Sequence, residues 1–145
     1  MTRWLLVLLT AGCAASAAPS GLLQAAPHGD GDSWKDTAGK EYRMGLVNAP
    51  ELNECFGAEA SRVRKSQVAD GFRATTYSTD RYGRLVSVIT TADGVDLNVW
   101  MAERGYVTDT YLAQFRDENP SEARRLDAAF AEAKRMRRGL WAACR

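Results

Sequence analysis

The sequence of 145 residues has few of the residues that identify a protein class at once. Its single histidine, His28, has no second histidine or cysteine near it, so we interpret it as a solvated loop residue rather than a metal ligand. Lysine and arginine number 19 and aspartate and glutamate 18, so no excess of positive charge predicts a nucleic-acid partner. Any contact with phosphates would depend on local clusters of charge.

The sequence also lacks a long apolar run. Trp4 to Thr10 is apolar but too short to span a bilayer as a stable anchor. Small residues follow, and Ala15-Ser16-Ala17 fits a cleavage site, which predicts a signal peptide over residues 1–17 and an exported protein. Alternatively, Thr10-Ala11-Gly12-Cys13 resembles a bacterial lipoprotein box. The leader would then end at residue 12, and lipidated Cys13 would hold the protein on the outer face of a membrane. We favour simple secretion.

Cysteine is scarce, with three residues in the chain, and either route of processing removes Cys13 from the count. Cys55 and Cys144 then remain as a pair in a compartment that permits disulfides. We therefore predict a disulfide between them. In the chain-entropy model, the long loop that it closes gives a stabilisation of roughly 4 kcal/mol.

The length accommodates one domain with a core of its own, and no internal repeat follows the leader. Residues 18–29 are rich in Ala, Pro and Gly and predict a linker or a short first strand, with a folded domain over residues 30–145. Local patterns predict strands over 32–37, 41–47, 72–79 and 84–91, and helices over 56–70, from Leu97 to Gly105, and from an Asn119 cap to Gly139.

This order of elements is α+β. A small closed barrel with about three helices on it would leave no sheet edge exposed. The stretch 108–117 is ambiguous and fits either a loop or one or two turns of helix. Trp141 is expected to fold back as a plug on the core. The basic run 134–138 is interpreted as a solvated helix end that complements the helix dipole, with nucleic-acid contact as a second possibility.

Residues suited to phosphate chemistry lie near the strand predicted over residues 41–47. The apolar run within this stretch indicates that the strand is buried. Asp32 and Asn48 offer hard oxygen ligands suited to calcium, and Arg43 and Arg84 are forked donors that match phosphate oxygens. Glu51 adds a carboxylate that can activate water. Singly, the arginines fit surface ion pairs and Glu51 fits a cap of the next segment. Their joint presence favours a site that hydrolyses phosphodiesters.

Five motifs then carry a resemblance to a known family. They are Asp30-Gly31-Asp32-Ser33, Arg43-Met44-Gly45-Leu46-Val47-Asn48-Ala49-Pro50-Glu51, Phe56-Gly57-Ala58-Glu59-Ala60, Asp80-Arg81-Tyr82-Gly83-Arg84 and Gly139-Leu140-Trp141. In order and spacing they resemble the staphylococcal nuclease (thermonuclease) family. The resemblance implies a five-stranded OB-type barrel and calcium-dependent hydrolysis of DNA or RNA. It also implies cleavage on the 5′ oxygen side, which leaves a 3′-phosphate.

The resemblance implies a metal site as well. Asp32 would bind calcium and the carbonyl of Ala49 would add a ligand. Asn48 stands where the family has a second calcium-binding aspartate, so it keeps an oxygen but removes one negative charge, and calcium affinity should fall. A catalytically weak or inactive OB module that binds nucleic acid or another partner is therefore the alternative function.

The catalytic roles implied are those of Glu51 as general base and of Arg43 and Arg84 as donors that stabilise the charge on the scissile phosphate. Tyr82 and Tyr111 match positions that contact the bound nucleotide. The substrate would be DNA or RNA, with no stable protein partner implied, a monomeric protein, and membrane contact only through a lipid on Cys13.

Overall fold

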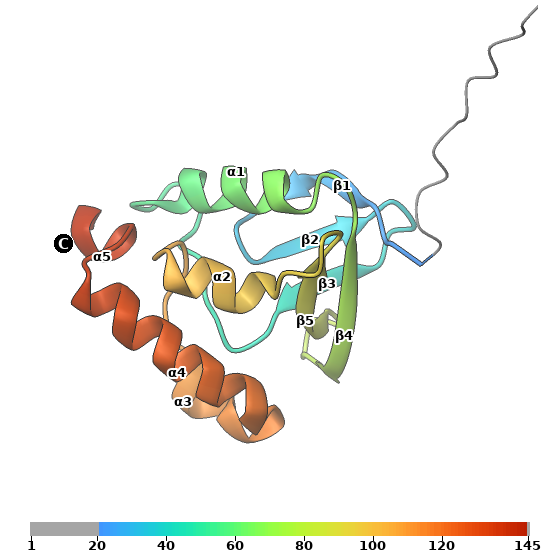
Figure 1. The fold of residues 1–145 in the computed structure, drawn as a ribbon. Helices are drawn as coiled ribbons and strands as arrows, with labels where there is room; N and C mark the ends of the chain where they lie inside the picture. The colour runs from blue at the N-terminus through green and yellow to red at the C-terminus, as the bar shows by residue number, and fades with distance from the viewer. Residues whose placement is uncertain (1–20, 145) are drawn as a thin grey trace, which may run out of the picture.

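The computed structural model describes residues 21–144, so the expected leader and Cys13 lie outside the described residues. Figure 1 shows a sheet on one side of the molecule and helices on the other. The elements are β1 (Ala25–Gly29), β2 (Ser33–Asp36), β3 (Glu41–Met44), α1 (Gly57–Gln67), β4 (Phe72–Thr79), β5 (Leu85–Thr91), α2 (Leu97–Glu103), α3 (Leu112–Phe115), the 3-10 helix η1 (Arg116–Glu118), α4 (Pro120–Arg135) and α5 (Leu140–Ala143). No helix in this part of the chain has the length and apolar character needed to cross a membrane.

The five strands form one mixed sheet in the order β1-β2-β3-β5-β4. β3 and β5 run parallel, and the other neighbouring pairs are antiparallel. The predicted five-stranded α+β class is confirmed. The prediction of a closed barrel went too far, because the sheet that the described residues form is not closed. Within residues 21–144, Leu23, two residues before β1, forms an isolated bridge with Phe72 at the start of β4, and the two exchange backbone hydrogen bonds of 2.8 and 2.9 Å.

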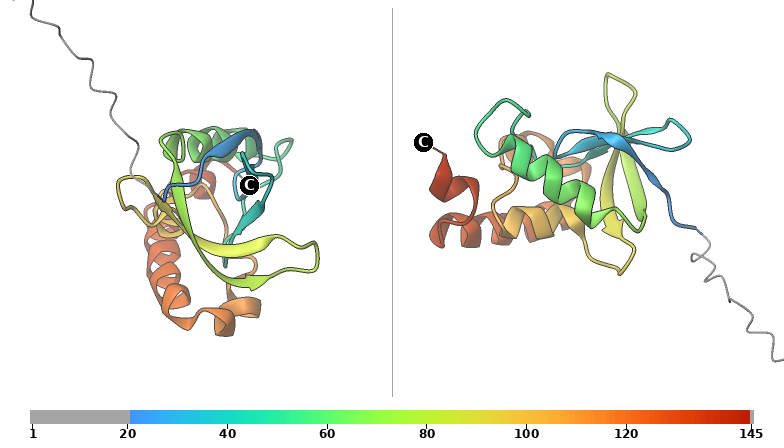
Figure 2. Two further views of the ribbon diagram at one scale, coloured as in Figure 1. Left: turned by 90° about the vertical axis from the view of Figure 1, so that its right-hand side faces the viewer. Right: turned by 90° about the horizontal axis from the view of Figure 1, so that it is seen from above.

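The core lies between this curved sheet and three longer helices. α1 contacts β1, and α2 packs on β5 and against α4, as the two views of Figure 2 show. In the sheet, the ring of Phe72 meets the edges or faces of Trp34 and Tyr42 at centroid distances of 5.3 Å. All three side chains are buried, and each buried aromatic ring stabilises the fold by roughly 2–3 kcal/mol.

The end of β3 differs from the sequence prediction. The strand predicted over residues 41–47 stops at Met44, so the predicted end at Val47 is wrong. Gly45 lies so close to Tyr77 that a Cβ there would stand 1.7 Å from the Tyr77 hydroxyl oxygen, and Leu46 adopts a left-handed φ of 63°. The strand therefore ends six residues before Pro50, where the backbone turns at Gly45 and Leu46.

Other local predictions agree more closely. The strand alternative for residues 18–29 is realised as β1, in which His28 is exposed. The Asn119 side chain accepts a hydrogen bond of 3.2 Å from the Glu122 backbone, which confirms the predicted cap of α4. α4 stops at Arg135, short of Gly139, and Trp141 lies half-buried in the single turn α5.

The disulfide prediction is confirmed. Cys55 and Cys144 are joined, with their Cα atoms 5.8 Å apart and 89 positions apart in sequence. The bond ties the loop that precedes α1 to the end of α5.

Candidate active site

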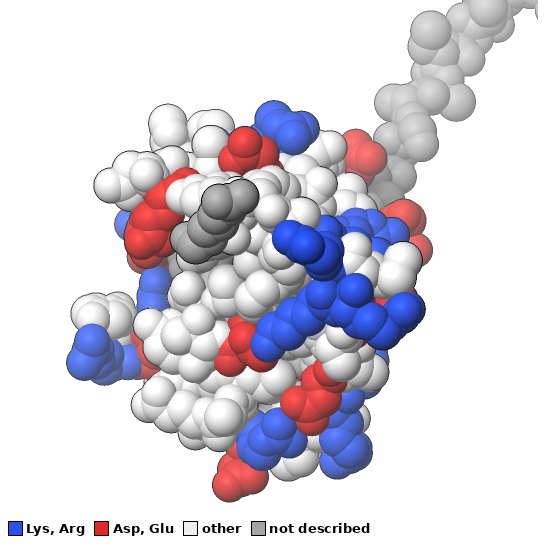
Figure 3. Space-filling model, turned by 90° about the vertical axis from the view of Figure 1, so that its left-hand side faces the viewer, with Lys and Arg blue, Asp and Glu red and all other residues white. Residues whose placement is uncertain are grey.

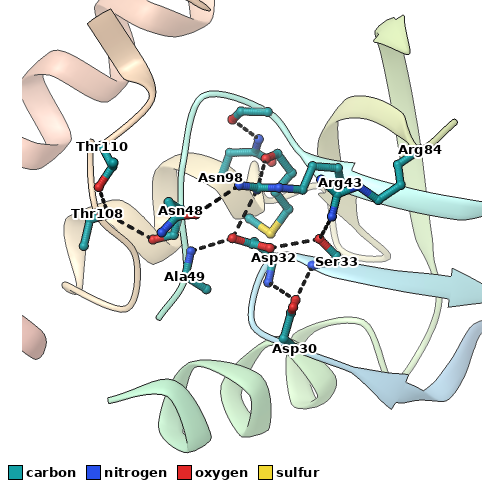
Figure 4. Close-up of polar contacts among 12 residues, drawn as sticks. Asp30, Asp32, Ser33, Arg43, Asn48, Ala49, Arg84, Asn98, Thr108 and Thr110 are labelled. Atoms are coloured by element: carbon teal, nitrogen blue, oxygen red, sulfur yellow. Dashed lines mark hydrogen bonds and ion pairs between the residues drawn. The ribbon is translucent and has the colours of Figure 1, made fainter. Parts of the chain in front are cut away.

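The sheet places two arginines side by side. Ser33 on β2 pairs with Arg43 on β3, and Arg43 pairs in parallel with Val86 on β5. Arg84 lies one residue before β5 begins. Because neighbouring strands lie about 4.8 Å apart, this register brings both guanidinium groups to one region of the sheet (Figure 4).

Arg43 is held by oxygen atoms on several sides. Its Nη1 lies 3.2 Å from Asp32 Oδ2 and donates to the Met44 carbonyl at 2.6 Å. Its Nη2 donates to Asn48 Oδ1 at 3.3 Å. The structure therefore brings Asp32, Arg43 and Asn48 together, as the sequence predicted.

Asp32 is the buried acid of this group. Its Oδ2 also accepts the Ala49 backbone N–H at 2.5 Å, and its Oδ1 accepts the Ser33 hydroxyl at 2.9 Å. Burial raises the pKa of the Asp32 carboxyl to about 6, although the Arg43 guanidinium opposes this change. The carboxyl therefore depends on its donors to carry a charge near neutral pH.

Arg84 joins the same network through the Ser33 hydroxyl. Its Nη1 donates to Ser33 Oγ at 3.2 Å, while its Nε donates to Asp80 Oδ2 at 2.7 Å. Asp80 also accepts the backbone N–H groups of Tyr82 and Arg84, which shapes the β4–β5 turn. Against the effect of burial, these donors lower the pKa of Asp80. Asp80 is thus a charged anchor for Arg84.

A cleft of about 440 Å³ opens in front of the two arginines. Tyr82, on one side, is 67% exposed, and the guanidinium groups of Arg81 and Arg84 lie 4.8 and 5.3 Å from its ring centroid. Tyr111, together with Phe115 at a ring-centroid distance of 6.1 Å, lines the cleft from α3 and the residue before it. The cleft therefore combines cationic donors with exposed aromatic faces.

Glu51 is the predicted site residue that this network does not include. Its side chain is exposed, and among the polar contacts of residues 21–144 its carboxylate has none with Asp32, Arg43 or Arg84. Its backbone N–H donates to Glu54 Oε2 at 2.8 Å. Glu51 follows Ala49 by two residues, so its Cα lies within roughly 7 Å of the Ala49 Cα. It lies near the site without a polar contact to the site's side chains among residues 21–144.

Two supporting residues were not identified from the sequence. Asn98 is fully buried and bonds the carbonyls of Gly45 and Ser87 at 3.1 and 3.2 Å, which holds β3 and β5 together beside the site. Arg64 is also fully buried, and its Nε donates to the Asp30 carbonyl at 3.0 Å below the Asp32 turn. Burial lowers the pKa of Arg64 to about 10. For both residues, the available sequence signal was a polar side chain within the apolar pattern of a helix.

A family model described as staphylococcal nuclease homologue matches residues 41–143. The chain belongs to this family. The match includes Arg43, Asn48 and Arg84, whereas Asp32 and Ser33 come from the hairpin ahead of it. The resemblance given by the five motifs is therefore confirmed, as is the OB-type class of the fold.

Curated relatives have endonuclease names. Two proteins called "uncharacterized endonuclease", from Escherichia coli O157:H7 and Escherichia coli, are each 31% identical over 112 residues, which is 70% of this chain and 64% of theirs. Endonuclease YhcR of Bacillus subtilis strain 168 is 27% identical over 108 residues, or 72% of this chain and 9% of its own length. The chain thus spans less than two thirds of the relatives that it matches.

The oxygen atoms around Arg43 can be compared with the ligands that a metal ion would need. Asp32 Oδ2 and the Asn48 amide oxygen both contact Arg43, at 3.2 and 3.3 Å, and are hard oxygen atoms of the type that calcium prefers. Within residues 21–144, no group of three or more His, Cys, Asp or Glu side chains converges. The donors therefore fit calcium in type, but Asn48 leaves one formal negative charge fewer than two carboxylates would supply.

Proposed function

We propose that this protein is a nuclease that hydrolyses phosphodiester bonds of DNA or RNA with calcium as its metal ion. The observation that carries the proposal is the chain of contacts from Arg84 through Ser33 and Asp32 to Arg43 at the wall of an aromatic-lined cleft. Membership of the staphylococcal nuclease family and the endonuclease names of the relatives support it.

Arg43 and Arg84 would bind the scissile phosphate. Both line the cleft, and their side chains are 11% and 25% exposed, so their donors are largely shielded from water yet open to a ligand. Planar guanidinium groups match phosphate oxygens and stabilise the charge that grows on them as water attacks. Removal of one such donor typically lowers kcat by roughly 10²–10³-fold.

Glu51 would take the proton of the attacking water. Its carboxylate is exposed on the loop beside Ala49, so a rotation of this side chain toward the cleft needs no change in the buried core. A bond then forms between the water oxygen and phosphorus, and the bond from phosphorus to the 5′ oxygen breaks. The leaving 5′ oxygen takes a proton, and the products are a 3′-phosphate and a 5′-hydroxyl.

Asp32, the Asn48 amide and the Ala49 carbonyl would hold calcium. When bound, calcium supplies positive charge that offsets the charge of the phosphate. The Ala49 N–H and the Ser33 hydroxyl fix the orientation of the Asp32 carboxylate from two sides. Tyr82 and Tyr111 would contact the nucleotide on either side of the bond that is cut.

A binding module without catalytic activity is the second candidate. The contacts that favour it are those of Arg43 with Asp32 and Asn48, since one guanidinium group then occupies the oxygens that a metal would use. In this case the cleft and its aromatic rings would still bind single strands.

We also propose that the protein acts outside the cytoplasm, released or lipid-anchored. The Cys55–Cys144 disulfide supports this proposal because such bonds persist in oxidising compartments.

Incubation of the purified protein with an end-labelled single-stranded oligonucleotide, with calcium or with a chelator, tests the proposal. We expect cutting with calcium only, and products whose new 3′ ends are sensitive to phosphatase. Arg84→Lys should lower the rate by about 10²-fold while the protein remains folded. Binding without cutting under both conditions would instead support the binding module.

A further inference from the structure

The C-terminal ends of α2 and α4 carry an arginine group that lies outside the cleft. We call it the arginine surface and define it as Arg104, Arg135, Arg137 and Arg138. Arg135 and Arg138 share the carboxylate of Glu132, at 2.9 and 3.6 Å, and Arg138 Nη1 donates to the carbonyl before Arg104 at 3.1 Å. Figure 3 shows Lys and Arg gathered in a contiguous group on this side of the molecule.

The arginine surface carries a larger net positive charge than the whole chain. Its four arginines face two carboxylates, those of Glu103 and Glu132, which leaves a formal charge of +2, whereas the complete chain carries +1. Within residues 21–144, exposed Arg137 has no carboxylate within 4.0 Å. Exposed ion pairs contribute roughly 0–1 kcal/mol, so a polyanion can displace them at little cost.

Aromatic rings hold two cations in place here. The guanidinium group of Arg104 lies 4.1 Å from the ring centroid of Trp100, and the ammonium group of Lys134 lies 4.8 Å from that of Trp141. A guanidinium group held against an indole loses less conformational freedom when it meets a phosphate than one that is free in solvent. The geometry therefore suits repeated phosphates.

A short segment connects this surface to the cleft. Gly105 accepts a hydrogen bond of 2.8 Å from Leu140 at the surface, Asp109 pairs with Lys134 at 2.5 Å, and Tyr111 lines the cleft. The segment from residue 105 to residue 111 can span at most roughly 20 Å. Because OB folds bind about 4–16 nucleotides of a single strand, one strand is long enough to occupy both places.

We propose that the arginine surface is a second binding site for the phosphate backbone of the substrate strand. The strand would leave the cleft, pass Lys134 and then reach this surface. The inference rests on the proposed nuclease function. It assigns the surface to affinity for long strands and not to the chemical step.

Binding of labelled oligonucleotides of 4 and 16 nucleotides in the presence of a chelator tests the assignment. The triple variant Arg104→Gln, Arg135→Gln and Arg137→Gln should raise the Kd of the 16-mer at least about fivefold and change that of the 4-mer less than about twofold. The slope of log Kd against log salt should fall by about 2 for the 16-mer, because three phosphate contacts are lost. Circular dichroism and thermal unfolding confirm that the variant is folded.

A matched variant removes the same charge elsewhere. Lys35, Lys40 and Arg62 are exposed on β2, the following turn and α1, and their replacement by Gln should leave the 16-mer Kd within about twofold. An equal loss in both variants, or none in the first, would overturn the assignment. Loss of binding to phosphatidylglycerol vesicles but not to the 16-mer would assign the surface to a membrane instead. Absence of binding and cutting by the unchanged protein would reject the nuclease proposal itself.

Discussion

Loss of the Cys55–Cys144 disulfide should lower the free energy of unfolding by about 4–5 kcal/mol. The two cysteines are 89 positions apart, and for a loop of this length the chain-entropy relation gives roughly 4.6 kcal/mol at 25 °C. The contacts that seat α5 remain without the bond, since Leu140 is buried and its N–H donates to the Gly105 carbonyl at 2.8 Å. The change should therefore act mainly on the unfolded chain.

Urea unfolding of the double variant Cys55→Ser and Cys144→Ser, compared with the oxidised protein, measures this difference. The m-value should rise, because an unfolded chain without the cross-link is less compact and exposes more surface. The oxidised protein treated with a dithiol, which reduces the bond to two thiols, is the control and should match the variant. A decrease below about 1 kcal/mol with an unchanged fold would refute the loop-entropy reasoning.

Three further changes test other parts of the structure. Asn48→Asp adds a negative charge where the amide oxygen now lies 3.3 Å from Arg43, so calcium affinity by calorimetric titration should rise roughly tenfold; an unchanged affinity would exclude this position from the metal site. Burial and the nearby Asp96 charge raise the pKa of Glu122 to about 7, so the folded state binds its proton more tightly than the unfolded state and loses stability as the pH rises from about 4.5 to 7. Glu122→Gln should therefore raise the free energy of unfolding by about 1–3 kcal/mol relative to the unchanged protein at pH 8 but not at pH 4. If the free energies of unfolding of the two proteins changed in parallel with pH, the shift would be contradicted. Gly45→Ala should lower the free energy of unfolding, measured by thermal unfolding, by about 1–3 kcal/mol, because the new Cβ clashes with the Tyr77 hydroxyl. The decrease should be smaller in a Tyr77→Phe background, and equal decreases in both backgrounds would disprove the clash.

The elements that could be predicted from the sequence are those set by neighbours along the chain. Asn119 and Pro120 announce the start of α4, and the Asp80 turn separates two strands whose observed bounds differ from the predicted ones by one residue at most. The five motifs likewise located both arginines of the cleft. Such signals act over a few residues and do not require the rest of the fold.

The features that could not be predicted depend on contacts between distant segments. Tyr77, 32 positions after Gly45, packs closely on Gly45 just past the end of β3, and Asn98 bonds the carbonyls of Gly45 and Ser87. Arg64 lies in the helix predicted over residues 56–70, and the sequence did not show that it is buried beneath the Asp32 turn. Glu51 was named from a motif, and the direction of its exposed side chain is not encoded by such a local pattern.

The parallel pairing of β3 with β5 has a consequence for how the molecule folds. Arg43 lies on β3 and Arg84 directly precedes β5, and the intervening stretch includes the whole of α1 and β4. Parallel strands separated by such a crossover form slowly, because loop-closure entropy is lost before the strands gain their contacts. In refolding experiments, helical circular dichroism should therefore return before the ability to bind phosphate. A nascent or partly folded chain has not yet brought Arg43 and Arg84 together, so it lacks the paired guanidinium groups of the cleft.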